Sequence, residues 1–154
     1  MLCCTGYELS EKQSYLNLLL SRNVDAVLLI GSHFIENSPE ENRYILDAAS
    51  KTPVLILNGE LKGDNIYSIL CDDYMALKDM TDLVFSNGAK SPIYLYRTLN
   101  YSGQKKAQGF LNSCAKHGID SSKNTLFAAP EGLHKACAVL EQLDAKGISF
   151  DCVL

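Results

Sequence analysis

The chain has 154 residues, of which 47% are hydrophobic, and its 14 Lys and Arg against 18 Asp and Glu give a net charge of −4 at pH 7. This composition is typical of a folded domain and excludes intrinsic disorder. The net negative charge does not indicate a basic surface that could contact a phosphate backbone, so we do not expect these residues to bind nucleic acid themselves. The longest apolar runs, residues 27–30 and 54–57, are far shorter than the roughly 20 residues that span a bilayer, so no membrane helix is predicted.

The N-terminus and the cysteines both favour a reducing compartment. Residues 1–7 contain neither a basic segment nor a small-residue cleavage site, so they do not indicate a signal peptide. The cysteines lie in apolar stretches without C-x-x-C spacing, which is typical of buried free thiols. They are Cys3, Cys4, Cys71, Cys114, Cys137 and Cys152. We therefore expect a cytoplasmic protein.

Apolar runs alternate with amphipathic patterns through the first half of the chain. Two capping boxes, Ser10 to Gln13 and Ser38 to Glu41, predict the starts of two helices. Continuous apolar runs at residues 26–30, 54–57 and 66–71 predict strands of a parallel sheet with helices on both faces.

A helix follows the third strand. Asp72 or Asp73 is expected to cap it, and Asn87-Gly88 to end it. The predicted buried stripe of this helix consists of Ala76, Met80, Leu83 and Val84.

The second half repeats the alternation. The pattern predicts strands at residues 93–96, 125–128 and 150–154, with a helix at residues 102–117 ended by Gly118 and another from Pro130 to Gly147. Repeated strand–helix–strand units imply parallel sheets and right-handed crossovers, so the fold class is α/β.

No cofactor or metal is predicted. The chain has no G-x-G-x-x-G after a strand and no phosphate-loop motif. Cys114 with His117 and His134 with Cys137 have the spacing of half a zinc site, but neither pair has a matching second pair nearby.

Four local patterns follow one another along nearly the whole chain. The first joins a helix end to a strand, the second is a Pro-led strand, the third is a strand, an acidic cap and a helix, and the fourth opens a helix. They are residues 22–29 (RNVDAVLL), 52–57 (TPVLIL), 69–90 (from ILCDDYMA to NGAK) and 102–110 (from Ser102 to Lys106-Ala107-Gln108-Gly109-Phe110).

In this order, the patterns resemble the effector-binding half of the LacI/GalR family of bacterial transcriptional regulators, whose fold is that of periplasmic sugar-binding proteins. The resemblance implies two periplasmic-binding-protein-like subdomains, each incomplete, over residues 1–90 and 91–154. It also implies a homodimer in which a small polar effector, a sugar or a sugar derivative, binds between the subdomains and modulates DNA binding. The helix-turn-helix headpiece that contacts DNA in this family is expected to lie outside this chain, which would be a middle portion of a longer regulator. No membrane partner is implied.

Five residues are candidates for effector binding, and none is a candidate for catalysis. Asp72 and Asp73 follow a strand at its carboxyl end, where open α/β sheets bind ligands, although a helix cap alone is the simpler explanation and ligand contact would be an added role. Asn100, Ser102 and Lys106 follow the strand at residues 93–96 in the same way. Lys106 stands where the family has a ligand-clamping Arg; it keeps the charge but lacks the planar fork that recognises two oxygens at once. His33 and Tyr101 are further residues for which a ligand contact is considered beside an ordinary structural role.

Two alternatives remain open at this point. The first is a solute-binding protein for sugar transport, which a signal peptide upstream of Met1 would favour. The second is a small α/β enzyme that uses Asp72 and Asp73. The chain contains no nucleophile elbow, so the expectation is that it is not an enzyme.

Overall fold

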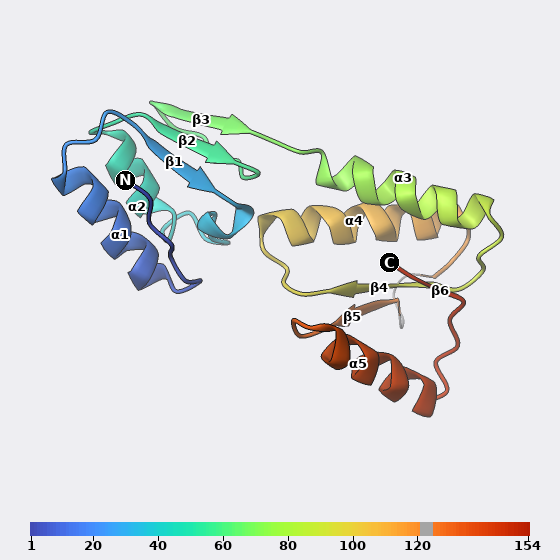
Figure 1. Cartoon of the computed structure of the whole chain (residues 1–154). Coiled ribbons are helices and arrows are strands. Elements are labelled where there is room, and N and C mark those ends of the chain that lie inside the picture. Colours follow the sequence, from blue (N-terminus) through green and yellow to red (C-terminus); the bar gives the residue numbers. More distant parts are fainter. Residues whose placement is uncertain (121–124) are drawn as a thin grey trace. The chain divides into compact units, whose positions relative to one another are not determined.

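A computed structural model describes residues 1–120 and 125–154, which form two compact units (Figure 1). The first unit contains residues 1–71 and 100–102, and the second contains residues 72–99 and 103–154. The helices and strands, in chain order, are α1 (Leu9–Ser21), β1 (Val27–Ile30), the 3-10 helix η1 (Ser32–Phe34), α2 (Arg43–Ala49), β2 (Val54–Leu57), β3 (Ile66–Ile69), α3 (Asp73–Ser86), β4 (Pro92–Tyr96), α4 (Tyr101–Lys116), β5 (Leu126–Ala128), α5 (Leu133–Ala145) and β6 (Cys152–Val153).

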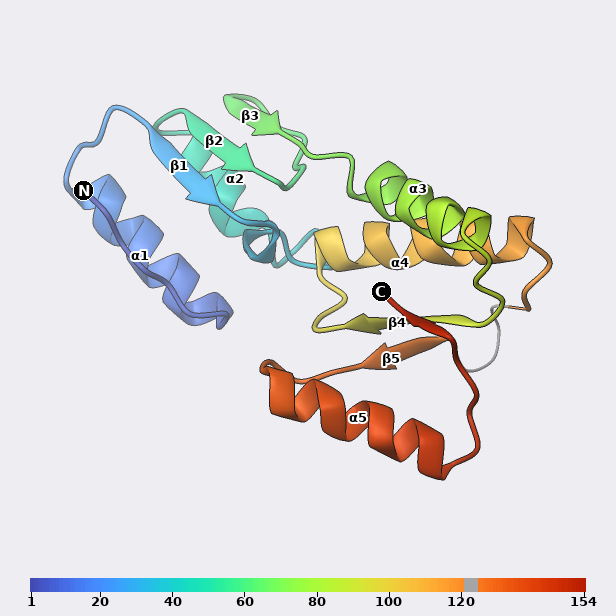
Figure 2. The ribbon, with the colours of Figure 1, turned by 45° about the vertical axis from the view of Figure 1, so that its right-hand side comes forward.

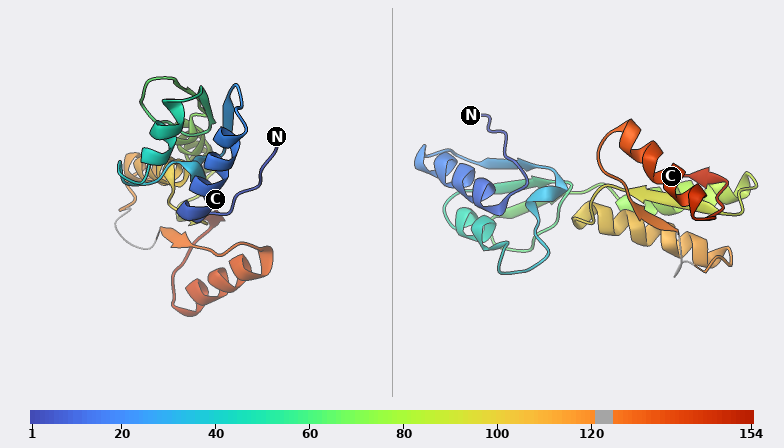
Figure 3. Two further views of the ribbon diagram at one scale, coloured as in Figure 1. Left: turned by 90° about the vertical axis from the view of Figure 1, so that its left-hand side faces the viewer. Right: turned by 90° about the horizontal axis from the view of Figure 1, so that it is seen from below.

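The first unit is a parallel sheet of order β1-β2-β3 with two helices on one face (Figure 1 and Figure 3). Alternate residues of β1 and β2 point toward α1 and α2, as the period of two in a strand requires. These side chains form the core of the unit, which consists of Leu16, Val27, Leu29, Ile35, Ile45, Ala48, Ala49, Val54 and Ile56.

The other face of this sheet is also apolar but largely exposed. The register places Leu28, Leu55 and Tyr67 in one row and Ile30, Leu57 and Ile69 in the next. Leu28 is 52% exposed, Ile30 61%, Tyr67 57% and Ile69 61%. The expectation of helices on both faces therefore does not hold for this sheet within the described residues, because α1 and α2 both pack on one side.

The two predicted capping boxes differ in outcome. Ser38 forms the first bond of its box, since its Oγ accepts from the Glu41 N–H at 3.2 Å. The Glu41 carboxylate accepts from the Ser38 hydroxyl at 2.9 Å, which is a bond between side chains and not the backbone bond of a capping box, and α2 begins only at Arg43. The Ser10 prediction was wrong: α1 begins at Leu9, and its N-cap Glu8 makes no side-chain cap bond.

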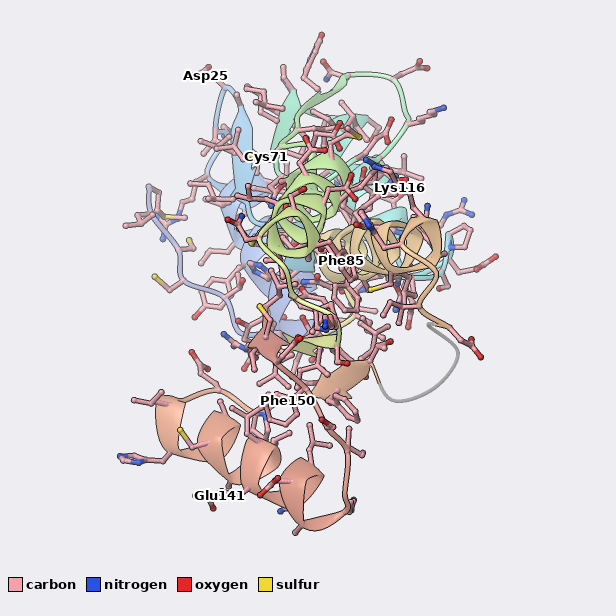
Figure 4. All side chains as sticks on the ribbon, turned by 90° about the vertical axis from the view of Figure 1, so that its right-hand side faces the viewer. Asp25, Cys71, Phe85, Lys116, Glu141 and Phe150 are labelled. Carbon is pink, nitrogen blue, oxygen red and sulfur yellow. The ribbon has the colours of Figure 1, made fainter. Side chains whose placement is uncertain are left out.

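The second unit is a parallel sheet of order β5-β4-β6. Helices α3 and α4 lie on one face of β4 and β5, and α5 lies on the other (Figure 1 and Figure 2). Leu77 of α3 and Tyr94 of β4 form a core with residues of α4, namely Ala107, Phe110 and Cys114. Leu143 is the buried residue of α5, and Glu141 is directed away from the sheet (Figure 4). The predicted α/β fold class is confirmed.

Helices α3 and α4 are held close together by a glycine and an aspartate. A Cβ on Gly109 would lie only 2.2 Å from the Tyr74 carbonyl oxygen, so only glycine permits this approach. Farther along, Asp82 accepts hydrogen bonds from Ser113 Oγ at 2.5 Å, Lys116 Nζ at 3.0 Å and Lys78 Nζ at 3.1 Å. These bonds, that from Ser113 foremost, hold the pKa of the Asp82 carboxyl well below its usual range.

Two expectations about this unit differ from the structure. The buried residues of α3 are Asp73, Leu77 and Thr81, whereas Met80 and Leu83 of the predicted stripe are exposed. The reason is that α3 carries apolar residues on several faces, and contact with α4 decides which face is covered. The expected subdomain boundary was at residue 90, whereas the first compact unit ends at Cys71 and the second begins at Asp72. The difference arises because α3 packs with α4 and therefore belongs to the second unit.

The cysteines are free, but their burial is not uniform. Cys114 is buried, which raises the pKa of its thiol to about 11, while Cys4, Cys71 and Cys137 are exposed. Among the described residues, no helix has the length and apolar character needed to cross a membrane.

Candidate functional site

Asp72 and Asp73 have different environments at the start of α3. The Asp72 Oδ1 accepts a hydrogen bond from the Met75 N–H at 2.9 Å, so Asp72 is the N-cap, and its side chain remains at the surface. Asp73, in the first turn, is buried. Asp72 is therefore the helix cap. The carboxylate of Asp73 has no capping role and makes other contacts.

The structure brings Lys106 and Asp73 together within the second unit. The Lys106 Nζ lies 3.5 Å from Asp73 Oδ1, and the Lys106 side chain is 42% exposed. Because the ammonium is partly solvated, this ion pair contributes at most about 1 kcal/mol to stability. An ammonium donor beside a carboxylate acceptor is a pair of groups that can bind the hydroxyls of one polar ligand.

Asn100 and Ser102 group with the first unit, not with the Lys106–Asp73 pair. Ser102 is buried and Asn100 is half-buried. Between them, Tyr101 packs against the core of the first unit, and its hydroxyl donates to the Glu60 carboxylate at 3.2 Å. The five predicted residues thus fall into two groups, with Asp72, Asp73 and Lys106 in the second unit.

The loop after β1, residues 31–38, lies at the carboxyl edge of the first unit's sheet and is held by buried side chains. Lys12, only 3% exposed, places its Nζ 2.5 Å from both the His33 carbonyl oxygen and the Glu36 carboxylate. Tyr44 donates to the Phe34 carbonyl at 2.7 Å. A buried ammonium must be paired in this way, so Lys12 is a structural group of the loop.

Asn42 holds the same loop. Its side-chain amide donates to the carbonyls of Glu36 and Ser38, each at 2.9 Å, and its Oδ1 accepts from the Glu36 N–H at 2.8 Å. The side chain of Asn42 thereby fixes both ends of the segment from Glu36 to Ser38. The β1 loop is therefore rigid at the edge where α/β sheets bind ligands.

Asn58 follows β2 at the same edge and was not predicted from the sequence. Within residues 1–120 and 125–154, its Oδ1 is the one buried side-chain acceptor that has no hydrogen-bond partner. Its backbone is left-handed, with φ 60°. The available signal was the Asn58-Gly59 dipeptide directly after a strand, which indicates a turn but says nothing about the amide.

A groove of about 530 Å³ in the first unit is lined by residues 1–5, α1 and β1. Its lining is mainly apolar, and the described residues that form it include none of the five predicted ones. Among the described residues, no group of three or more His, Cys, Asp and Glu side chains could hold a metal ion.

No family model matches the chain, but two curated proteins do. It is 39% identical over 153 residues to an HTH-type transcriptional regulator of Lachnoclostridium phytofermentans, which covers 99% of this chain and 46% of that protein. It is 27% identical over 138 residues to the HTH-type transcriptional repressor PurR of Glaesserella parasuis, covering 85% and 38% respectively. The chain thus spans less than half the length of these relatives, one of which is named as a transcriptional regulator and the other as a transcriptional repressor.

Solved structures agree with the curated relatives. A sugar-binding LacI-family regulator from Escherichia coli complexed with phosphate matches with a TM-score of 0.77 at 20% identity, over 94% of this chain and 51% of that one. A LacI-family regulator from Lactobacillus casei with bound sucrose matches with a TM-score of 0.77 at 22% identity, over 99% and 56%.

The two-unit α/β fold of this chain is therefore that of transcriptional regulators. More particularly, it is the fold of the LacI-family transcriptional regulators, and the resemblance predicted from the four sequence patterns is confirmed.

Proposed function

We propose that this chain is the effector-binding portion of a LacI-type transcriptional regulator. In this proposal it binds a small polar effector, a sugar or sugar derivative, and modulates DNA binding by a headpiece outside these residues, as a cytoplasmic homodimer. The observation that carries the proposal is the match of nearly the whole chain to regulators of this fold, one of which, from Lactobacillus casei, holds sucrose in one structure and glucose in another.

Lys106 and Asp73 are the residues that we propose to contact the effector directly. The ammonium donates to ligand oxygens and the carboxylate accepts from ligand hydroxyls, so the pair suits a neutral polyol. Asp72, Asn100 and Ser102 are proposed as further contacts. Because Lys106 lacks the fork of an arginine, each ligand oxygen that it binds is held by one donor, with less fixed geometry.

The effector acts through differential affinity. A ligand that binds one arrangement of the domain more tightly than another shifts the population toward it, and a ligand with equal affinity for both shifts nothing. A coupling free energy of about 1–3 kcal/mol, typical of allosteric proteins, would change operator affinity roughly 5–150-fold.

Thermal-shift titration with glucose and sucrose tests the site. We expect either sugar to raise the melting temperature of the chain, and Lys106→Ala to remove that shift because the donor is lost. Lys105→Ala is the matched control, since it removes the same charge from the neighbouring position of α4, where the side chain is exposed. An unchanged sugar response in Lys106→Ala would exclude Lys106 from the site.

A further inference from the structure

Strand β1 of the first unit has one unpaired edge. The Val27 and Gly31 N–H groups donate to carbonyls on the β2 side, at 2.9 Å and 3.0 Å. Because backbone groups alternate in direction along a strand, those of Leu28 and Ile30 point away from β2. No strand among the described residues pairs with that side of β1. The strand also contains neither the proline nor the charge that usually protects an edge.

An apolar groove of about 530 Å³ lies along this edge, between β1, α1 and residues 1–5. Leu16 and Leu19 of α1 are among the residues that line it. A small apolar molecule in the groove would cover the polar backbone of Leu28 and Ile30 without pairing it, which is costly. An extended peptide segment would pair with that backbone and fill the groove, so the groove suits a strand.

Residues 1–5 have the character of a strand that lacks a partner. Their burial alternates, with Leu2 and Cys4 exposed and Cys3 and Thr5 partly buried, as the period of two in a strand requires. Within the described part of the chain their backbone forms no hydrogen bond, and Leu2 is 87% exposed. Neither these residues nor β1 carries a charged side chain, so no like-charge repulsion opposes their pairing.

We propose that two copies of this chain associate by exchanging residues 1–5, which enter the groove of the other copy and pair with β1 there. Each copy supplies both the segment and the groove, so a twofold axis closes the contact. The two segments then lie side by side between the two β1 strands, and the axis makes them antiparallel. The result is one continuous sheet that joins β1, β2 and β3 of both copies. The inference goes beyond the proposed function, which includes a homodimer but assigns no surface to it.

Analytical ultracentrifugation of paired variants tests the contact. The unmodified chain should sediment with twice the mass of one chain at micromolar concentration. Cys4→Pro removes an N–H of the exchanged segment that is unbonded within one copy, so it should weaken dimerisation about tenfold or more and leave the circular dichroism unchanged. Cys4→Ser keeps that N–H and should dimerise as the unmodified chain does. Leu28→Pro removes an N–H of the receiving edge and should act like Cys4→Pro.

Hydrogen exchange measured by NMR distinguishes strand pairing from apolar contact alone. The amides of Leu28 and Ile30 should exchange about tenfold more slowly, or slower still, in the unmodified chain than in Cys4→Pro, because they are bonded only in the dimer. The amides of Val27 and Gly31, which bond to the β2 side within one copy, should differ little. Equal exchange of Leu28 and Ile30 in the two proteins would overturn the strand exchange.

The sedimentation results also have outcomes that contradict the inference. A monomeric unmodified chain would overturn it, and so would a Cys4→Pro chain that dimerises with unchanged affinity, since the contact would then lie elsewhere. Neither result bears on effector binding, which the sugar titration of Lys106→Ala tests separately.

Discussion

At the scale of single residues, the polar groups at the carboxyl edge of the first unit's sheet are a pre-organised set. Lys12 is buried and satisfied, and its two acceptors, His33 O and Glu36 Oε1, belong to the same loop. Under the proposed function, an effector that binds at this edge would cost the loop little further conformational freedom, which lowers the free-energy cost of association.

The pH dependence of stability should report the environment of His33. Burial foremost, and then the nearby Lys12 ammonium, lower the pKa of His33 below its usual 6.5, while Glu36 acts in the opposite direction. The neutral imidazole is thus favoured in the folded chain, and the unfolded chain binds the proton more readily. Stability should be full above about pH 6.5 and should fall as the pH drops below that value toward the lower pKa of the folded state.

Urea denaturation between pH 5 and 8 checks this expectation. His33→Gln, which stays neutral, should flatten the part of the profile below pH 6.5, and His134→Gln, at an exposed position of α5, is the control. A profile that is identical in the unmodified chain and in His33→Gln would contradict the assigned cause.

Sequence reasoning located some of these residues and missed others for a physical reason. Asp72 could be predicted as a cap because capping depends on local spacing alone. The contact of Lys106 with Asp73 was not predicted, because it joins residues 33 positions apart on two helices. Lys12 and Asn58 were missed because burial of an ammonium or an amide depends on packing between elements, which a single sequence pattern does not encode.

At the scale of elements, the contact between α3 and α4 determines where the candidate groups of the second unit lie. Gly109 permits the close approach at the first turn of α3, the turn that carries Asp73. Lys106 lies one turn before Gly109 on α4, so the same close approach sets the distance between the Lys106 ammonium and the Asp73 carboxylate.

The sequence predicted both helices, together with their terminal glycines, because caps and apolar periodicity are local signals. It did not predict the exposed Met80 and Leu83, since only the partner helix selects the buried face of α3.

Gly109→Ala should disrupt this contact. The added Cβ would meet the Tyr74 carbonyl oxygen at 2.2 Å, and both groups are backbone-bound, so the helices must separate. We expect a loss of about 1–3 kcal/mol in the free energy of unfolding, as for other overpacked positions, together with a weaker sugar response. Gln108→Ala, at an exposed neighbouring position of α4, should change neither quantity appreciably. Urea denaturation and the thermal-shift titration measure the two effects, and a Gly109→Ala chain as stable as the unmodified one would contradict the packing argument.

At the scale of the whole molecule, the chain has two separate cores, one around Ile45 and Ile56 and the other around Phe110 and Cys114. Each core is built from its own sheet and its own helices, and the chain passes from the first unit to the second after β3 and returns only for residues 100–102. The proposed function, in which a ligand shifts a conformational equilibrium, needs parts that are internally rigid, and two independent cores meet that need.

Independent cores predict independent unfolding. Ile45→Ala and Phe110→Ala each remove a fully buried side chain, at an expected cost of about 2–5 kcal/mol. In hydrogen-exchange mass spectrometry, Ile45→Ala should accelerate exchange in β1, β2 and α2 while leaving α3 and α4 unchanged, and Phe110→Ala should do the reverse. This follows because each cavity destabilises only the elements that share its core, which then open as one cooperative unit. If either substitution accelerated exchange equally in all elements, the chain would unfold as a single unit, and a mechanism based on two rigid parts would lose its physical basis.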